Sequence, residues 1–148
     1  MYQNGCNAYR QSAANTVEDK RVILLKLYDG ALKFLANAKR GIIEQSPRIR
    51  GENISKVMAI IDELNCALDM DKGGQLAAQL GGLYQFAMDQ LATANLKNDL
   101  QALGQAERIL ATLKEGFEEA HHQLKSVSNT PQVMEETTPV QEGVRFAV

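Results

Sequence analysis

Glu118 and His121 come closest, by type and spacing, to a metal site in this chain. They lie three positions apart, the Glu-x-x-His spacing that di-iron proteins use on the helices of a bundle. Such a site needs a second Glu-x-x-His pair and two further glutamates, but the chain's only other histidine is the adjacent His122. Solvated residues in the last turns of a helix, where histidines complement the negative end of the dipole, explain the cluster better. We therefore expect no metal and no cofactor.

Nucleophilic catalysis would need a serine or cysteine beside a general base such as histidine. The two histidines are adjacent near the predicted end of a helix, and Cys6 lies in a polar, irregular N-terminal stretch. The carboxylates of Asp62, Glu63, Asp69 and Asp71 fit a solvated helix face better than an acid and base pair in a desolvated pocket. The sequence therefore predicts no catalytic residues, and a protein that is not an enzyme.

The composition limits the partners and the compartment. A formal net charge of −2 over 148 residues argues against a protein that neutralises nucleic acid phosphates. Cys6 and Cys66 form neither a disulfide framework nor a metal motif, and we interpret both as free thiols in a reducing compartment. Residues 1–20 lack the apolar run of a signal peptide, and no stretch approaches the ~20 apolar residues of a membrane span. We expect a cytoplasmic protein with no nucleic acid partner and no membrane insertion.

Four long stretches carry apolar residues at every third or fourth position, the spacing of amphipathic helices. The first should begin between Thr16 and Asp19 and end before Ser46 and Pro47, because a residue that precedes proline avoids the helical region. The rows expected to face the core are Leu24, Tyr28, Ala31, Leu35, Ala38 and Ile42; Ile54, Val57, Ile61, Leu64 and Leu68; Leu76, Leu80, Leu83, Ala87, Leu91 and Ala94; and Leu103, Ala106, Leu110, Leu113, Phe117, Ala120 and Leu124. With short connections and no strand-like alternation, these stretches predict an all-α fold, an antiparallel up-and-down four-helix bundle.

Glycines interrupt this pattern at two informative places. Gly30 lies inside a strongly helical stretch, so either a second helix approaches closely there or the helix tolerates a glycine that costs about 1 kcal/mol relative to alanine. Lys72, Gly73 and Gly74 combine a cation with candidate left-handed cap residues, which predicts the end of the second helix. No Lys-Ser/Thr pair follows these glycines, as a phosphate-binding loop would require.

The chain divides by composition into an N-terminal arm, residues 1–15, a bundle, residues 16–125, and a flexible tail, residues 126–148. In the tail, proline, threonine, glutamate and glutamine replace the periodic pattern, which is typical of disorder. Its last residues, 144–148, are apolar enough for a docking peptide, although we prefer the interpretation that this terminus has no binding role.

More apolar residues are present than the bundle core needs. The third stretch adds Tyr84, Phe86 and Met88 to its core row, and Gly81 and Gly82 leave a bare patch there. Monomeric proteins rarely expose large contiguous apolar patches, so the excess points to a partner or to a segment of the chain that covers it. We hypothesise that the arm is this cover. Deleting residues 1–12 should then raise the binding of a hydrophobic dye or of a helical peptide, and an unchanged affinity would contradict the hypothesis.

Several short motifs occur in a characteristic order: Ala8-Tyr9, Leu27-Tyr28-Asp29-Gly30-Ala31, Lys33-Phe34-Leu35, Ile60-Ile61-x-Glu63-Leu64, Leu68-Asp69, Lys72-Gly73-Gly74, Leu83-Tyr84 and Ala94-Asn95-Leu96-Lys97-Asn98-Asp99. In these motifs the chain resembles the FliS family of flagellar secretion chaperones. It departs from the family pattern in three places. Residues 17–20 replace the usual Ser/Thr/Asp-Pro pair, Gln75 stands where glutamate is usual, and Gln79 where asparagine is usual.

The resemblance implies an export chaperone that binds the C-terminal helical region of flagellin. Such a chaperone prevents premature polymerisation and keeps flagellin competent for flagellar type III export, and the flagellar export gate is a further expected partner. An amphipathic helix laid into a groove of a bundle, through apolar anchors at helical spacing, fits that role. The residues expected to bind the partner are Tyr9, Leu24, Tyr28, Leu32, Leu80, Tyr84 and Leu91.

The alternative is a non-enzymatic helical adaptor, or a bundle that forms a homodimer through its apolar face. A dimerisation face predicts a mass in solution that depends on concentration. A groove covered by the arm predicts a monomer that opens to a peptide. We expect a monomer or a weak homodimer.

Overall fold

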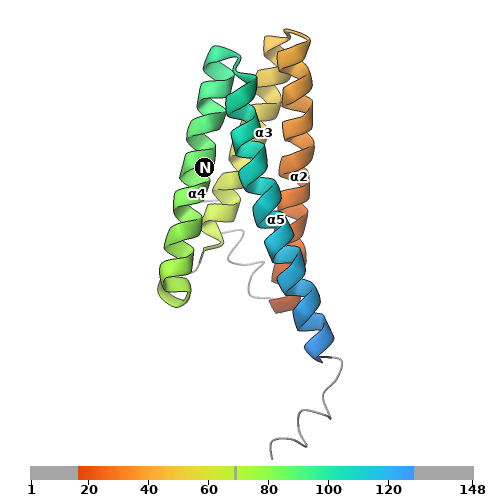
Figure 1. The fold of residues 1–148 in the computed structure, drawn as a ribbon, viewed down its shortest axis with the longest axis vertical. Coiled ribbons are helices and arrows are strands. Elements are labelled where there is room, and N and C mark those ends of the chain that lie inside the picture. The colour runs from red at the N-terminus through yellow and green to blue at the C-terminus, as the bar shows by residue number, and fades with distance from the viewer. Residues whose placement is uncertain (1–16, 69, 129–148) are drawn as a thin grey trace, which may run out of the picture. The chain divides into compact units, whose positions relative to one another are not determined.

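The computed structural model describes residues 17–68 and 70–128, and all the regular secondary structure in these ranges is helical. The four helices are α2 (Val17–Ile43), α3 (Pro47–Cys66), α4 (Met70–Lys97) and α5 (Leu100–Ser128). Successive helices run in opposite directions (Figure 1). The predicted all-α, antiparallel four-helix fold is confirmed.

The chain separates into two compact units, Met1–Glu115 and Gly116–Val148, and the division falls inside α5. The first unit contains α2, α3, α4 and residues 100–115 of α5. In the second unit, residues 116–128 continue as helix, past the predicted end of the bundle at residue 125. The arm, residues 1–15, and the tail beyond residue 128 lie outside the described residues.

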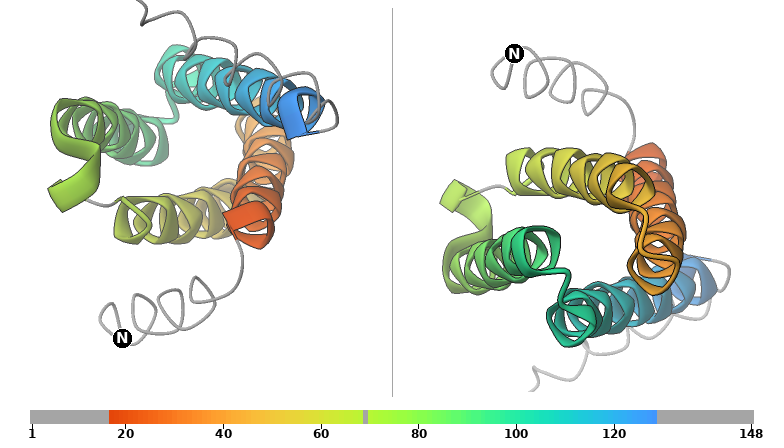
Figure 2. Two further views of the ribbon diagram at one scale, coloured as in Figure 1. Left: turned by 90° about the horizontal axis from the view of Figure 1, so that it is seen from below. Right: turned by 90° about the horizontal axis from the view of Figure 1, so that it is seen from above.

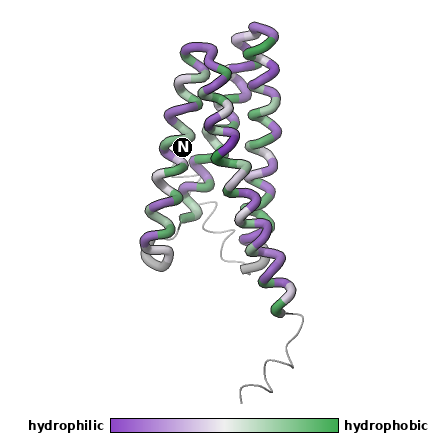
Figure 3. The backbone as a smooth tube through the Cα atoms, viewed as in Figure 1, coloured by the Kyte–Doolittle hydropathy of each residue, from purple (hydrophilic) through white to green (hydrophobic). Residues whose placement is uncertain are grey.

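Within the first unit, the most extensive helix contact is between α2 and α3, and α3 also packs against α4. Figure 2 shows α2 and α4 at opposite corners of the bundle. Apolar and polar residues alternate along each helix (Figure 3), which is the pattern of helices with one apolar face. Among the described residues, the buried side chains are all hydrophobic, with no buried charged group.

The predicted core rows are correct for most of α2 and α3. All predicted members of these rows are buried except Leu24 and Leu68, which are half-buried. In α5, the buried residues are Ala102, Leu103, Ala106 and Leu110, whereas the predicted Leu124 is 44% exposed.

The predicted core row of α4 is partly wrong. Ala87, Leu91 and Ala94 are buried as expected, but Leu76 and Leu83 are exposed. Ala77 and Tyr84 take their places, each one residue further along the helix. Adjacent residues lie about 100° apart around a helix with 3.6 residues per turn, so where Ala77 and Tyr84 face the core, Leu76 and Leu83 are turned away from it.

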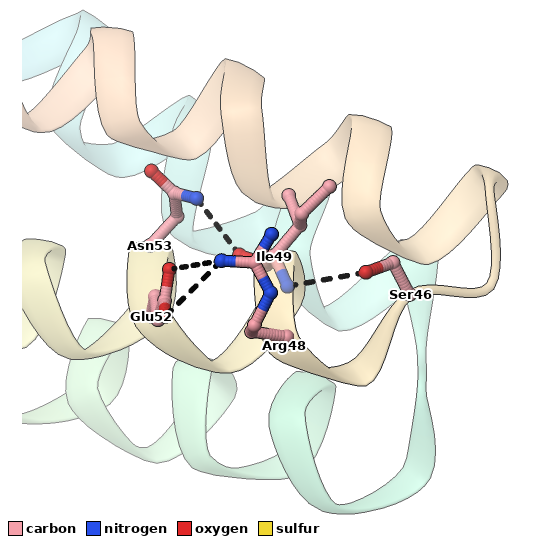
Figure 4. A network of polar contacts seen from close by, with 5 residues as sticks. All are labelled: Ser46, Arg48, Ile49, Glu52 and Asn53. Carbon is pink, nitrogen blue, oxygen red and sulfur yellow. Dashed lines mark hydrogen bonds and ion pairs between the residues drawn. The ribbon is translucent and has the colours of Figure 1, made fainter.

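The turn between α2 and α3 is set by local chemistry. Ser46 is the N-cap of α3, and its Oγ accepts a hydrogen bond of 3.3 Å from the backbone N–H of Ile49 (Figure 4). Pro47 occupies the first turn, where its missing N–H costs nothing. Behind them, Arg48 forms an ion pair of 3.4 Å with Glu52 one helical turn away. The predicted break at Ser46 and Pro47 is confirmed.

The close backbone approach that we considered for Gly30 occurs at Gly41 instead. A Cβ atom at Gly41 would lie 2.5 Å from the backbone nitrogen of Arg50 on α3. At Gly30, an added Cβ would meet only the side chain of Ile60, at 3.4 Å. Gly30 is therefore a tolerated glycine, and Gly41 is the position where α2 and α3 come too close for a side chain.

The end of the second helix also differs from the prediction. Helix α3 ends at Cys66, with Ala67 as its C-cap, several residues before Gly73. Gly74 does adopt a positive φ of 52°, but it breaks the first turns of α4 rather than ending α3. Only glycine adopts such a conformation without strain, which accounts for its presence here.

The turn between α4 and α5 accounts for the Asn98-Asp99 motif. Asn98 has a positive φ of 53°, the conformation of a residue that ends a helix. The Oδ1 atom of Asp99 accepts hydrogen bonds from the backbone N–H groups of Gln101 and Ala102, at 2.9 and 3.1 Å, and so caps α5. Arg50 donates from Nη1 to Oδ1 of Asn98 at 2.7 Å and ties α3 to this turn.

Candidate partner-binding surface

Two of the predicted partner-binding residues, Tyr28 on α2 and Tyr84 on α4, meet inside the bundle. Their hydroxyl oxygens are 2.5 Å apart, and the side chains are 0% and 2% exposed. Burial, with a further contribution from Tyr84, raises the pKa of Tyr28 well above its ordinary value. In this conformation the two tyrosines belong to the core and link the opposite corners of the bundle.

The other predicted residues are placed as follows. Leu91 is fully buried on α4. Leu24 and Leu32 on α2, and Leu80 on α4, are half-buried. Tyr9 lies outside the described residues. The structure therefore brings Tyr28 and Tyr84 together, and the partner-binding role of the whole set stays a prediction.

An exposed apolar row runs along α4, and of its members only Phe86 was predicted from the sequence to lie outside the core row. Leu76, Leu83 and Phe86 are 61%, 39% and 45% exposed. They are separated by seven and three residues, so they share one face of the helix. We call them the α4 outer row. The sequence signal was present, because Ala77, Tyr84, Ala87, Leu91 and Ala94 form an alternative core row that leaves these three residues outside.

A groove of about 370 Å³ continues the outer row toward the α4–α5 turn. Phe86, Gln90 and Thr93 line it from α4. Asp99, Gln101, Ala102 and Gln105 line it from the turn and from α5. From Leu76 to Thr93 the strip is about 26 Å long at 1.5 Å per residue, which is enough for four to five turns of a second helix. An amphipathic helix could bind along this strip, with its apolar residues against the apolar end and its polar residues against the amide-rich end.

Two further hollows among the described residues of the first unit are smaller. One, of about 120 Å³, lies between α2 and α5 and is lined by Leu35, Lys39, Leu100 and Leu103, among others. The other, of about 70 Å³, lies between α3 and α4 beside Tyr84 and Met88. Neither is large enough to hold a helix, so the α4 outer row and its groove are the more extended feature.

The structure also bears on the candidate metal ligands, on the cysteines and on membrane spans. Glu118 and His121 lie on α5, and no group of three or more potential metal-ligating side chains occurs within residues 17–68 and 70–128. Cys66 is disulfide-bonded, so the expectation of a free thiol there is wrong; Cys6 lies outside the described residues. Within the described part of the chain, no helix is both long and apolar enough to cross a membrane.

Comparison with known proteins identifies the family. Residues 2–124 match the family model of the flagellar protein FliS. The chain is 32% identical over 118 residues to the flagellar secretion chaperone FliS of Bacillus subtilis, which covers 80% of this chain and 86% of the relative. It is 34% identical to the proteins of the same name from Salmonella typhimurium and Campylobacter jejuni, over 78% of this chain and 89% and 90% of theirs. The chain therefore belongs to the FliS family of flagellar secretion chaperones.

Proposed function

We propose that this protein is a non-enzymatic, cytoplasmic export chaperone that binds the C-terminal helical region of flagellin. It would prevent premature polymerisation and keep flagellin competent for flagellar type III export, with the export gate as a further partner. Membership of the FliS family supports the role. The observation that carries the proposal is the α4 outer row, three large apolar side chains exposed on one face of a helix and continued by a groove.

The outer row suits a helix better than an extended strand. Its members repeat at helical spacing, so an amphipathic helix aligned with α4 would place its own apolar residues against them. A partner that folds on binding loses part of the interaction energy to ordering, and the length of the strip provides the contact area that this loss requires.

The predicted site residues divide into two roles under this proposal. Leu80 is half-buried on α4, so part of its side chain can contact a helix on the outer row, whereas Leu24 and Leu32 are half-buried on α2, at the opposite corner, and would contact another segment of flagellin. Tyr28, Tyr84 and Leu91 are buried and would support the surface from beneath. Tyr9 would contact flagellin, or cover the same surface, from the arm.

Calorimetric titration with a peptide of the C-terminal helical region of flagellin, with circular dichroism on the mixture, tests the proposal. We expect one-to-one binding and a gain of helix. Leu83→Asp should weaken the affinity about tenfold or more, because central apolar anchors contribute most of the binding energy of such interfaces. Ala92→Asp is the matched control. Ala92 is exposed on the same helix but about 100° or more away from the outer row, so its substitution should leave the affinity within about twofold.

Absence of binding, both to the full chain and to a chain without residues 1–12, would contradict the flagellin assignment. Equal losses in Leu83→Asp and Ala92→Asp would place the binding surface elsewhere. The alternative function, an adaptor or a homodimerising bundle, is favoured by the same exposed leucines and phenylalanine, since they could equally contact a second copy.

A further inference from the structure

The first half of α4 is packed differently from the second half. Within residues 73–83, Ala77 is the one residue among those described that is buried. From Tyr84 onward every turn contributes a buried side chain: Tyr84, Ala87, Leu91 and Ala94. A segment of about three turns that fully buries one methyl group, and half-buries Leu80 beside it, gains little from packing.

The same segment has a backbone that is unfavourable for a helix. Gly73, Gly74, Gly81 and Gly82 all fall in it, and each glycine in a helix interior costs roughly 1 kcal/mol relative to alanine. Gly74 already departs from helical geometry, with φ 52° and ψ −123°. Gly82 has no atom within 4 Å of the position of an added Cβ, so no close contact explains its lack of a side chain.

We propose that residues 75–83 open and close as a local unit while the rest of the bundle stays folded, and that a bound partner helix stabilises the closed form. The opening would pivot at Gly74 and end at Tyr84, where continuous burial begins. Two of the three residues of the outer row, Leu76 and Leu83, lie within this unit. The coupling to a partner rests on the proposed function, whereas the local opening does not.

The physical link between opening and binding is direct. Leu76 and Leu83 form one continuous apolar face with Phe86 only while residues 75–83 are helical. A partner that requires this face binds the closed form alone, so binding lowers the open population by mass action. Affinity for the partner would therefore depend on glycines that the partner does not touch.

Hydrogen exchange of the free full-length protein tests the local opening. Gly82→Ala should slow exchange of the amides in residues 75–83 about fivefold, the ratio that corresponds to the helix preference of alanine over glycine. It should leave the amides of residues 84–97 nearly unchanged. Gly104→Ala on α5 is the matched control, because its added Cβ also meets nothing within 4 Å. This control should not slow residues 75–83, since its helix lies outside the local unit. Equal slowing by the two variants would overturn the proposal, because it would mean that residues 75–83 exchange only when the whole bundle unfolds.

The same measurement with the flagellin peptide tests the coupling. At a free peptide concentration ten times its Kd, exchange in residues 75–83 should slow about tenfold. A peptide that binds, as judged by calorimetry, without slowing these amides would overturn the coupling while leaving the proposed function intact. A peptide that does not bind would overturn the proposed function and the coupling, while the result in the free protein would still decide the local opening.

Discussion

The hydroxyl group of Tyr28 contributes to the stability of the bundle and makes that stability depend on pH. Its ring is fully buried, and its hydroxyl contacts that of Tyr84. Tyr28→Phe keeps the ring and removes the hydroxyl, so we expect a loss of about 1 kcal/mol in the free energy of unfolding at neutral pH. Urea unfolding followed by circular dichroism measures this loss.

The raised pKa of Tyr28 gives the loss a distinct pH dependence. An unfolded tyrosine ionises near pH 10, whereas the buried Tyr28 keeps its proton at that pH. Above about pH 10 the unfolded state therefore binds fewer protons, and the stabilisation falls by about 1.4 kcal/mol per pH unit. The difference between the wild type and Tyr28→Phe should be constant from pH 7 to 9 and shrink above pH 10. A difference that stays constant through pH 11 would contradict the burial of this hydroxyl.

At the scale of the elements, the contact between α2 and α3 depends on Gly41. Gly41→Ala would place a Cβ atom 2.5 Å from the backbone of Arg50, so the helices must separate. We expect a loss of about 1 to 3 kcal/mol in stability, the usual cost of overpacking. Thermal and urea unfolding provide the measurement.

Gly30→Ala is the matched control on the same helix. Its added Cβ would make an ordinary contact with Ile60, and alanine favours the helix, so stability should stay equal or rise by up to about 1 kcal/mol. If Gly30→Ala destabilised as much as Gly41→Ala, the closest approach of the two helices would not be at Gly41.

The helices also show which features of the sequence are sufficient for prediction. In α2 and α3, the predicted rows keep one register over several turns and nearly all of their members are buried, although α2 also carries large apolar residues off its row, such as Leu25 and Leu27. In α4, Leu83 and Tyr84 are neighbours, and either could belong to the core row. Hydrophobicity favoured leucine, whereas the structure buries the tyrosine, because its hydroxyl has a partner on α2. That partnership depends on contact between distant parts of the chain, which periodicity along one helix does not encode.

The same lack of information about contacts between distant parts of the chain explains why the site was predicted less well than the fold. The family and the helical fold could be predicted from motifs and spacing. The outer row was not predicted, because the sequence of α4 allows two core rows, and choosing between them requires the arrangement of all the helices. Gly41 was likewise overlooked, since a glycine near the end of a helix has no distinctive neighbours in the sequence.

At the scale of the whole molecule, the exposed outer row raises the question of self-association. An isolated row of three apolar side chains is small compared with the interfaces of stable dimers. We therefore expect sedimentation equilibrium to give the mass of a monomer, with at most a weak dimer at high concentration. A mass that rises with concentration, and that Leu83→Asp returns to the monomer value, would favour the homodimer alternative.

The hydroxyl pair at the centre of the bundle has a consequence for how the helices align lengthwise. Aliphatic contacts have no preferred direction, so only the fit of their shapes opposes a slip of one helix along another by a full turn, about 5.4 Å. The Tyr28 and Tyr84 hydroxyls would be pulled apart by such a slip and would lose the contact that they make across the core. The other buried residues in the described part of the chain are aliphatic. This pair therefore provides the directional contact that sets the lengthwise position of α2 against α4.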